Sequence, residues 1–343
     1  MIFTSDNAYG AAPEILESLA RANAGALPSY GDDEITAQLS GRMSAVFERE
    51  VAVFPVVSGT AANALALATL VPPHGAVLCH ADAHIAADEC GAVEFFSHGA
   101  RLVTIEGENG KLTAESIARA LERFRAGFVH HSQPAAVSLT QASECGTCYR
   151  LDEIAAISAL ARKHGLKLHM DGARFANAIA HLGCSAAEAT WRIGVDALSF
   201  GATKNGALCA EAVVFFDPDT VRDFEYRRKK SGHLVSKMRF LSAQLLSYLE
   251  DERWIASARR ANAIAARLGR ALETTAGVEI AHPIEANAVF ARVPDEMSAR
   301  LRAAGAHFYD WSPPSGGRTL IRLVCAFATP EADITRFIGI AQA

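Results

Sequence analysis

Residues 196–207 read Asp-Ala-Leu-Ser-Phe-Gly-Ala-Thr-Lys-Asn-Gly-Ala, and this stretch holds the strongest clue to the fold. An apolar run typical of a short strand ends at Phe200, small residues follow, and Lys204 then stands between small neighbours. A lone amine in this setting suits a lysine that forms a Schiff base better than a lysine on a solvated surface. The stretch therefore predicts a functional loop at the end of a buried strand.

A second strand-like run ends in the same way upstream of Lys204. Residues 166–174 read Leu-Lys-Leu-His-Met-Asp-Gly-Ala-Arg, and Asp171 follows the apolar part. An aspartate for a pyridinium nitrogen and a lysine for an aldehyde carbon are two of the groups that pyridoxal phosphate (PLP) needs. Local sequence also allows the plainer interpretation, that Asp171 caps a helix or ends a strand.

Short apolar strands and amphipathic helices alternate along the first two thirds of the chain. This alternation predicts an α/β fold with a mostly parallel seven-stranded sheet covered by helices. The expected strands are 51–57, 76–79, 101–105, 127–130, 166–170, 197–200 and 212–216. The expected helices between them are 61–71, 83–98, 113–124 and 151–163, the last of which ends at His164-Gly165.

The pattern changes after about residue 217. A long helical stretch is expected over 221–268, with a break near 231–232, followed by strands over 278–282, 288–293 and 320–325 and two short helices. We expect a large domain and a small C-terminal α+β domain from this pattern, and the family resemblance described below implies that the large domain binds PLP and that an N-terminal segment reaches the active site or an interface. The predicted ranges are 1–40 for the N-terminal segment, 41–245 for the large domain and 246–343 for the small domain.

Composition excludes several classes of protein. The 343 residues carry a formal net charge of −5, so nothing attracts nucleic acid or anionic membranes. The sequence has no apolar run of membrane-spanning length and no signal-peptide pattern at its start. Seven cysteines, an odd and scattered number, favour reduced thiols and a cytoplasmic location. We interpret the Cys-Gly-Thr-Cys of residues 145–148 as two ordinary thiols and predict no metal site, since no second ligand pair follows.

A tight turn of small residues, Ser58-Gly59-Thr60, joins an expected strand to an expected helix. Free backbone N–H groups and the positive end of the helix dipole make such a turn a candidate phosphate site. A plain N-cap without a ligand is the alternative. The Walker pattern and the dinucleotide fingerprint are both missing, which disfavours a nucleotide-binding or NAD-dependent domain.

Three further side chains are candidates for the site. His84 could stack on a pyridine face and exchange protons, or serve a structural role. Arg174 could bind the ring hydroxyl or a substrate carboxylate, or form a surface ion pair. Arg322, inside an apolar strand, needs an anionic partner, either a substrate α-carboxylate or an intramolecular acid. The basic run 227–230 is typical of a solvated helix face.

Six segments in register resemble one known family. The chain is similar to the low-specificity L-threonine aldolases of the aspartate-aminotransferase-like superfamily, which are PLP enzymes of fold type I. The resemblance extends from Phe3 to about Thr329. Its segments are 5–7 (Ser-Asp-Asn), 30–33 (Tyr-Gly-Asp-Asp), 58–63 (Ser-Gly-Thr-Ala-Ala-Asn), 82–84 (Asp-Ala-His), 171–174 (Asp-Gly-Ala-Arg) and 199–206 (Ser-Phe-Gly-Ala-Thr-Lys-Asn-Gly).

The resemblance implies a role for each candidate residue. Lys204 would form the Schiff base, Asp171 would bind the pyridine nitrogen, and His84 would stack on the ring and act in catalysis. Tyr30 would reach the substrate from a neighbouring subunit, because family members share sites across a dimer, usually within a tetramer. The cofactor-binding set would be Ser58, Gly59, Thr60, His84, Asp171, Arg174, Thr203 and Lys204, with Lys229 and Arg239 lent to a neighbour's phosphate. The substrate-binding set would be Ser5, Tyr30, Arg174 and Arg322.

The resemblance also implies an activity: an aldehyde-lyase that cleaves a β-hydroxy-α-amino acid into glycine and an aldehyde. L-threonine, L-allo-threonine and phenylserine are the candidate substrates. Many family members carry a Glu-Asn-Thr-His-Asn type segment after the central strand, whereas residues 138–144 contain no histidine. The chain therefore resembles a divergent branch, in which the base could be His84 or another group. Transamination and β-elimination on the same scaffold, and a non-catalytic PLP fold, are the rival interpretations.

Overall fold

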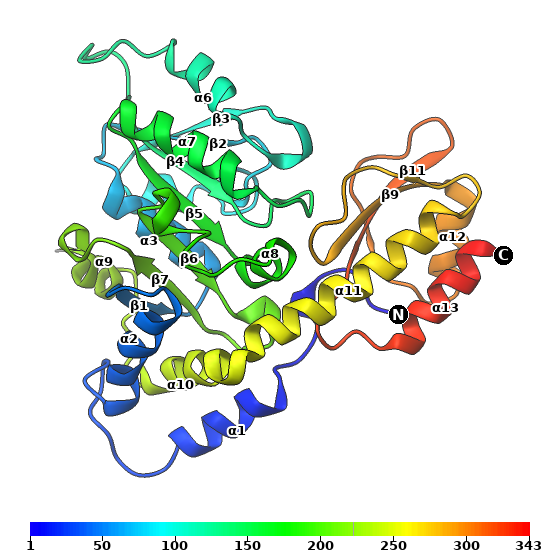
Figure 1. Cartoon of the computed structure of the whole chain (residues 1–343), viewed down its shortest axis with the longest axis horizontal. Coiled ribbons are helices and arrows are strands. Elements are labelled where there is room, and N and C mark those ends of the chain that lie inside the picture. Colours follow the sequence, from blue (N-terminus) through cyan, green and yellow to red (C-terminus); the bar gives the residue numbers. More distant parts are fainter. Residues whose placement is uncertain (222) are drawn as a thin grey trace.

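The computed structural model describes residues 1–221 and 223–343, which form two sheets with separate hydrophobic cores (Figure 1). The larger sheet has seven strands in the order β1-β7-β6-β5-β4-β2-β3. β7 runs in the direction opposite to the other six strands. The predicted α/β class and the mostly parallel sheet are therefore confirmed. The strands are β1 (Ala52–Val56), β2 (Gly75–His80), β3 (Arg101–Ile105), β4 (Gln133–Thr140), β5 (Lys167–Gly172), β6 (Ala197–Gly201) and β7 (Glu211–Phe215).

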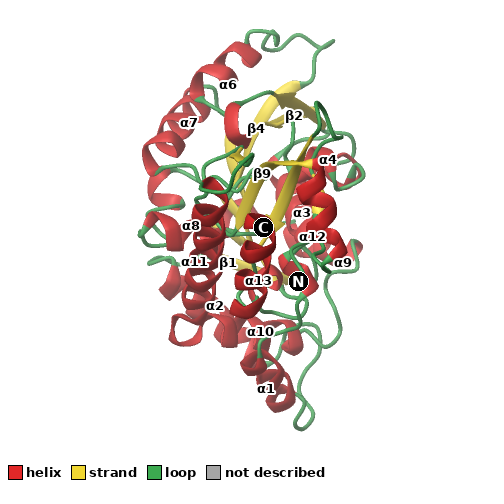
Figure 2. Cartoon of the chain, turned by 90° about the vertical axis from the view of Figure 1, so that its right-hand side faces the viewer, coloured by secondary structure: helices red, strands yellow, loops and turns green. Residues whose placement is uncertain are grey.

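Helices cover both faces of this sheet (Figure 2). Val213 and Phe215 of β7 pack in one cluster with helix α3, whereas Ala212 and Val214 belong to the core on the other face, which includes α7 and α8. Burial on both faces explains why the strands are continuous apolar runs. The helices up to this point are α1 (Pro13–Ala22), α2 (Glu34–Val46), α3 (Gly59–Leu70), α4 (His84–Ala87), α5 (Ala92–Phe96), α6 (Ala114–Leu121), α7 (Leu151–Lys163) and α8 (Phe175–Leu182).

The smaller sheet is antiparallel and lies beside the C-terminal helices. Its order is β10-β11-β9-β8, and its core includes Phe3 from the N-terminal segment. The first turns of α11 pack on the core of the large sheet, and its later turns pack on that of the small sheet. The remaining elements are α9 (Phe224–Lys230), α10 (Arg239–Leu249), α11 (Arg253–Glu273), β8 (Glu279–Ile280), β9 (Ala288–Pro294), α12 (Asp295–Ala303), β10 (Tyr309–Asp310), β11 (Arg318–Val324) and α13 (Glu331–Gln342).

The N-terminal segment runs from the small sheet to the large one. Ile2 forms a β-bridge with His307, and the backbone carbonyl of Phe3 accepts a hydrogen bond from Val324 at 2.9 Å. The 3₁₀ helix η1 (Asp6–Ala8) then reaches the loop that follows β6. We propose the ranges 1–40, 41–245 and 246–343 as the three parts of the chain, and the two separate cores support this division.

Two of the expected elements are wrong. Residues 127–130 form turns, because Gly127 adopts a φ of 70° and its N–H donates to the side chain of Gln133, where β4 begins. The expected helix 83–98 is broken into α4 and α5 by Cys90 and Gly91, which have φ values of 52° and 76°.

Other expectations hold more closely. The helix over 151–163 is confirmed residue for residue, and it ends before Gly165, whose φ is 67°. The stretch 221–268 contains three helices, α9 to α11, and its residue Arg222 lies outside the described residues. Within the described chain, the helices lack the combination of length and apolar character that crossing a bilayer would require.

Candidate active site

A cavity of about 370 Å³ lies at the edge of the large sheet, where β4, β5 and β6 end and α3 begins. Ligand sites of open α/β sheets form at this edge, and the volume suits a small cofactor. The cavity brings together most of the residues that the sequence singled out. Those that line it are Ser58, Gly59, Thr60, His84, Asp171, Arg174, Thr203 and Lys204.

Lys204 lies in the short 3₁₀ helix η4 (Thr203–Asn205) directly after β6. The loop can sit close to the end of β5 because position 201 is glycine, where a Cβ atom would lie 2.6 Å from the Ala173 carbonyl oxygen. Burial and the charge of Arg174 lower the pKa of the Lys204 amine, although Asp6, Asp171 and Glu211 act in the opposite direction. A larger fraction of this amine is therefore neutral, and nucleophilic, than at a surface lysine.

Asp171 ends β5 and is 3% exposed. One carboxylate oxygen accepts the backbone N–H of Ala173 at 2.9 Å, and the other accepts the side-chain amide of Asn63 at 2.8 Å. These two bonds fix the orientation of a carboxylate that borders the cavity. Such a group can hold a ring N–H in a charge-assisted hydrogen bond.

A chain of hydrogen bonds connects Asp171 to His84. The Nδ2 atom of Asn63 also donates to Oε1 of Glu89 at 2.9 Å, and the same oxygen lies 2.8 Å from Nδ1 of His84. The hydrogen bond that Glu89 accepts from His84 raises the pKa of His84, and burial raises the pKa of Glu89. The pair therefore keeps a proton to a higher pH than a free histidine would.

Arg174 forms a two-pronged ion pair with Asp6 of the N-terminal segment. The Nε and Nη2 atoms lie 2.8 and 3.0 Å from the two carboxylate oxygens, and Asn287 donates a further bond at 3.0 Å. Burial acts to raise the pKa of Asp6, but the charges of Arg174 and Lys204 outweigh it and hold the pKa below its ordinary value. Arg174 thus does form an ion pair, as the alternative interpretation had it, but with a buried aspartate at the border of the cavity and not on the surface.

Two more carboxylates line the cavity. Burial, followed by the charge of Asp171, raises the pKa of Glu144 to about 7. Burial also raises the pKa of Glu211 to about 7, while hydrogen bonds from Thr203 and Ala202 act against it. Both groups therefore titrate near neutral pH.

Ser5 and Arg322 lie next to the lining residues. Ser5 caps η1, and its hydroxyl lies 3.4 Å from Asp6. Arg322 lies over the ring of Trp311, with 4.6 Å from its Cζ to the ring centre, and donates to the backbone carbonyl of Thr4. Burial lowers the pKa of Arg322, the charge of Arg174 adds to this effect, and the charge of Asp6 opposes it.

Tyr30, Lys229 and Arg239 do not line the cavity of their own chain. The ammonium group of Lys229 lies 4.4 Å from the centre of the Tyr30 ring, and the Tyr30 backbone N–H donates to Ser236 at 2.9 Å. Tyr30 and Lys229 are therefore in contact, and the segment that pairs with Tyr30 lies just before Arg239 in the chain. Their predicted contribution to a second subunit stays a prediction.

Sequence reasoning missed Glu89, Glu144 and Glu211, and it gave Asp6 and Asn63 no role. Glu211 carries a signal that was available: a charged residue at the start of an apolar strand. Glu89 follows a histidine by five positions, which is a weak pattern in any helix–turn segment. Glu144 lies in a loop of mixed composition, and only the fold shows that it reaches the cavity.

The residues present fit PLP. Gly59 and Thr60 open α3, so their N–H groups have no partner within the helix, and the space beside Gly59 is open. Within the described chain, three buried polar atoms around the cavity also lack a hydrogen-bond partner: Oδ1 of Asn63, Oε2 of Glu89 and Oε2 of Glu144. The site thus combines the Lys204 amine, the fixed carboxylate of Asp171, free N–H groups at the start of α3 and unsatisfied polar atoms. This combination indicates a site for a polar ligand.

A strand-end lysine and aspartate beside a helix N-terminus, on a parallel sheet covered by helices on both faces, define a PLP-dependent enzyme of fold type I. The family model described as beta-eliminating lyase matches residues 3–296, and the chain belongs to this family. This match and the threonine aldolases described next together confirm the resemblance found in the sequence.

Relatives that are threonine aldolases match nearly the whole chain. It is 45% identical over 341 residues to the low specificity L-threonine aldolase of Pseudomonas aeruginosa, which covers 99% of this chain and 96% of the relative. It is 44% identical over 333 residues to that of a Pseudomonas species, with 97% and 94% covered. The structure of Leishmania major threonine aldolase superimposes with a TM-score of 0.93 at 29% identity, with 99% and 98% covered.

Proposed function

We propose that the protein is a PLP-dependent lyase that cleaves L-threonine, L-allo-threonine or a related β-hydroxy-α-amino acid, such as phenylserine, into glycine and an aldehyde. The observation that carries the class of chemistry is the meeting of Lys204 and Asp171 in one cavity. The choice of reaction is supported by near-full-length similarity to relatives named as threonine aldolases.

Bound PLP supplies an aldehyde carbon that captures amines and a protonated ring that accepts an electron pair. Lys204 would attach the cofactor through its amine, and Asp171 would hold the ring N–H. Ser58, Gly59, Thr60 and Thr203 would bind the phosphate, using free backbone N–H groups and hydroxyls at the positive end of α3. His84, held by Glu89, would cover one face of the ring.

Arg174 would hold the α-carboxylate of the substrate. The pair with Asp6 uses one N–H of Nε and one of Nη2, so the N–H groups of Nη1 and the second N–H of Nη2 are left for the substrate. Arg322 would add a second cation and Ser5 a hydroxyl at the same edge. A carboxylate fixed in this way orients the Cα–Cβ bond of the substrate, which is how positioning lowers the barrier.

The assembly we propose is a homodimer with shared active sites, within a tetramer. Tyr30, Lys229 and Arg239 would serve the neighbouring subunit, Tyr30 at its substrate and the two cations at its phosphate. Support comes from their absence from the cavity of their own chain and from the contact of Lys229 with the Tyr30 ring. We also propose a cytoplasmic location, since the cysteines of the described chain are all free.

The test is an assay of the purified holoenzyme with L-threonine, L-allo-threonine and phenylserine. Glycine and aldehyde should form in equal amounts, and Lys204→Ala should abolish both turnover and the visible absorption band of the attached cofactor. Lys163→Ala, which removes an exposed amine at the end of α7, is the matched control and should behave as the wild type. Full turnover by Lys204→Ala would refute the proposal.

β-Elimination is the second candidate, because the matching family model carries that name. The same incubations distinguish the two reactions. Elimination or transamination releases a keto acid, and elimination also releases ammonia, whereas aldol cleavage releases neither. Keto acid as the main product from all three substrates would favour the second candidate.

A further inference from the structure

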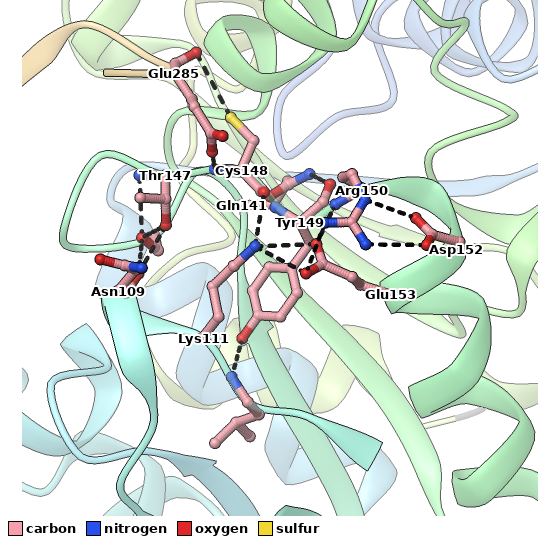
Figure 3. A network of polar contacts seen from close by, with 12 residues as sticks. Asn109, Lys111, Gln141, Thr147, Cys148, Tyr149, Arg150, Asp152, Glu153 and Glu285 are labelled. Atoms are coloured by element: carbon pink, nitrogen blue, oxygen red, sulfur yellow. Dashed lines mark hydrogen bonds and ion pairs between the residues drawn. The ribbon is translucent and has the colours of Figure 1, made fainter. Parts of the chain in front are cut away.

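The loop between β4 and α7, residues 141–150, forms one wall of the cavity through Glu144. The side chain of Gln141 closes this loop: it donates to the carbonyl of Tyr149 and accepts the N–H of the same residue, both at 2.9 Å (Figure 3). The Thr147 hydroxyl donates to the backbone carbonyl of Asn109 at 2.7 Å. The loop is thus held by the protein alone.

The loop is anchored from two other directions as well. The Cys148 N–H donates to Glu285, from the segment before β9, at 2.7 Å, and the Tyr149 hydroxyl accepts the N–H of Leu112 at 2.7 Å (Figure 3). These contacts fix the backbone on both sides of Glu144. The position of its carboxylate is therefore set before any ligand arrives, as catalysis by a positioned group requires.

The carboxylate of Glu144 is only partly satisfied. Its Oε1 atom accepts the backbone N–H of His84 at 2.9 Å, whereas Oε2 is buried and has no hydrogen-bond partner among the described residues. A buried acceptor without a donor is costly and uncommon. Since the residue lines the cavity, the missing donor can be supplied by a ligand there.

Most polar atoms of the other acids and bases in the cavity already have partners, although Oε2 of Glu89 lacks one among the described residues and Nε2 of His84 takes no part in the Glu89 contact. Both oxygens of Asp171 accept hydrogen bonds from the protein, and Nδ1 of His84 is held by Glu89. The side chain of Glu89 has no exposed surface, and its Oε1 atom already contacts both Asn63 and His84. Glu144 is the carboxylate that combines a place in the cavity wall with a fixed loop and a spare acceptor atom.

We propose that Glu144 accepts the proton of the substrate's β-hydroxyl group, an assignment that rests on the function proposed above. The O–H bond breaks, its proton passes to the carboxylate, and its electron pair becomes the second bond of the aldehyde C=O. The Cα–Cβ bond breaks and leaves its pair on Cα. Cα then takes up one proton, which completes glycine, and Glu144 releases its own proton to solvent.

The charge environment of Glu144 suits this task. Burial and the neighbouring Asp171 raise its pKa to about 7, against the hydrogen bond from the His84 N–H and the nearby dipoles of its own backbone and the Thr140 hydroxyl. The charge of Glu144 in turn contributes to raising the pKa of four neighbouring groups, which are Arg174, Cys79, Cys145 and Tyr149. A general base works best when its pKa lies near the working pH.

The test uses Glu144→Gln, which keeps the shape and can still accept the His84 N–H. Cleavage of L-threonine should fall by about 10²- to 10⁴-fold, the usual contribution of a general base. Exchange of the glycine α-proton in D₂O, followed by NMR, needs no β-hydroxyl base and should keep the wild-type rate. The amount of bound cofactor should also equal that of the wild type. Glu94→Gln is the matched control, since Glu94 also has a buried, unpartnered oxygen but does not line the cavity.

Two outcomes would overturn the proposal: unchanged cleavage by Glu144→Gln, or equal loss of cleavage and glycine exchange, which would make Glu144 a structural or cofactor-positioning group. Glu144→Ala provides a second measurement. Added formate should restore part of its cleavage activity if a carboxylate is what the reaction lacks, and no rescue would count against the role. Failure of the wild type to cleave any of the three substrates would instead refute the proposed function itself.

Discussion

The two walls of the cavity are built in different ways. On one wall, Asp171 and Lys204 follow adjacent parallel strands, and each lies in a short run of small residues. On the other wall, His84, Glu89 and Glu144 come from a broken helical segment and from the loop after β4. The first wall carries the groups that hold the cofactor, and the second carries the groups that we expect to move protons.

A single side chain joins the two walls. The amide of Asn63 donates to Asp171 on one side and to Glu89 on the other, at 2.8 and 2.9 Å. A change on either wall can therefore reach the other through one residue. The difference between the walls predicts that mutations on the first will disrupt binding and stability, while mutations on the second will alter pH dependence.

The largest effect is expected for Asp6→Asn, which removes the buried partner of Arg174. Breaking a buried pair from one side costs about 3–5 kcal/mol, because an uncompensated charge stays behind. The folded pKa of Asp6 lies below its ordinary value of 3.8, so the pair stabilises the fold above that pH and the contribution is lost as the pH falls. Denaturant unfolding at pH 7 and pH 3 measures both effects.

An exposed pair provides the control for Asp6. Asp152 pairs with Arg150 in a similar two-pronged geometry, but both side chains are more than half exposed. Asp152→Asn should leave the midpoint of unfolding unchanged, because solvent screens exposed pairs. Equal destabilisation by the two variants would mean that burial of the Asp6–Arg174 pair is not what makes it matter.

The next largest effect is expected for Asp171→Asn. The carboxamide keeps the shape but loses the charge that would hold the ring N–H, so kcat should fall by about 10²- to 10³-fold, as for other preorganised electrostatic groups. The cofactor should still attach through Lys204. Asp196→Asn is the matched control, since Asp196 lies at the opposite end of β6 and bonds Lys167. Loss of cofactor content in parallel with kcat would contradict this separation.

The two walls also differ in how far sequence could predict them. The strand ends with Asp171 and Lys204, the helix start at Ser58 and the helix over 151–163 all follow from local patterns. The place of Glu144 in the cavity could not be predicted in this way, because it depends on contacts of its loop with Asn109 and Glu285 from distant segments. The strand predicted at 127–130 was wrong for a similar reason. The Gln133 side chain accepts the N–H of Gly127 and donates to the carbonyl of His131, and these hydrogen bonds stabilise turns that hydrophobic periodicity cannot predict.

The smallest effect is expected for Glu89→Gln, on the second wall. The amide oxygen can still accept from Asn63 and His84, so only the charge is lost, at a cost of about 1 kcal/mol. The pKa of His84 should fall, because its hydrogen bond to the Glu89 carboxylate is the main cause that raises it. The folded wild type binds a proton more tightly than the unfolded chain, whose histidine has a pKa of 6.5, so the pair stabilises the protein below that pH.

This contribution should be lost as the pH rises through the folded pKa of His84, and Glu89→Gln should remove the step. NMR titration of the His84 ring, with unfolding measured at pH 5.5 and pH 8.5, tests both expectations. The change should be confined to the second wall: the visible band of the cofactor on Lys204 should keep the wild-type position, because Asn63 still holds Asp171. A shifted band would show that the two walls act as one unit through Asn63, and the contrast between them would then be lost.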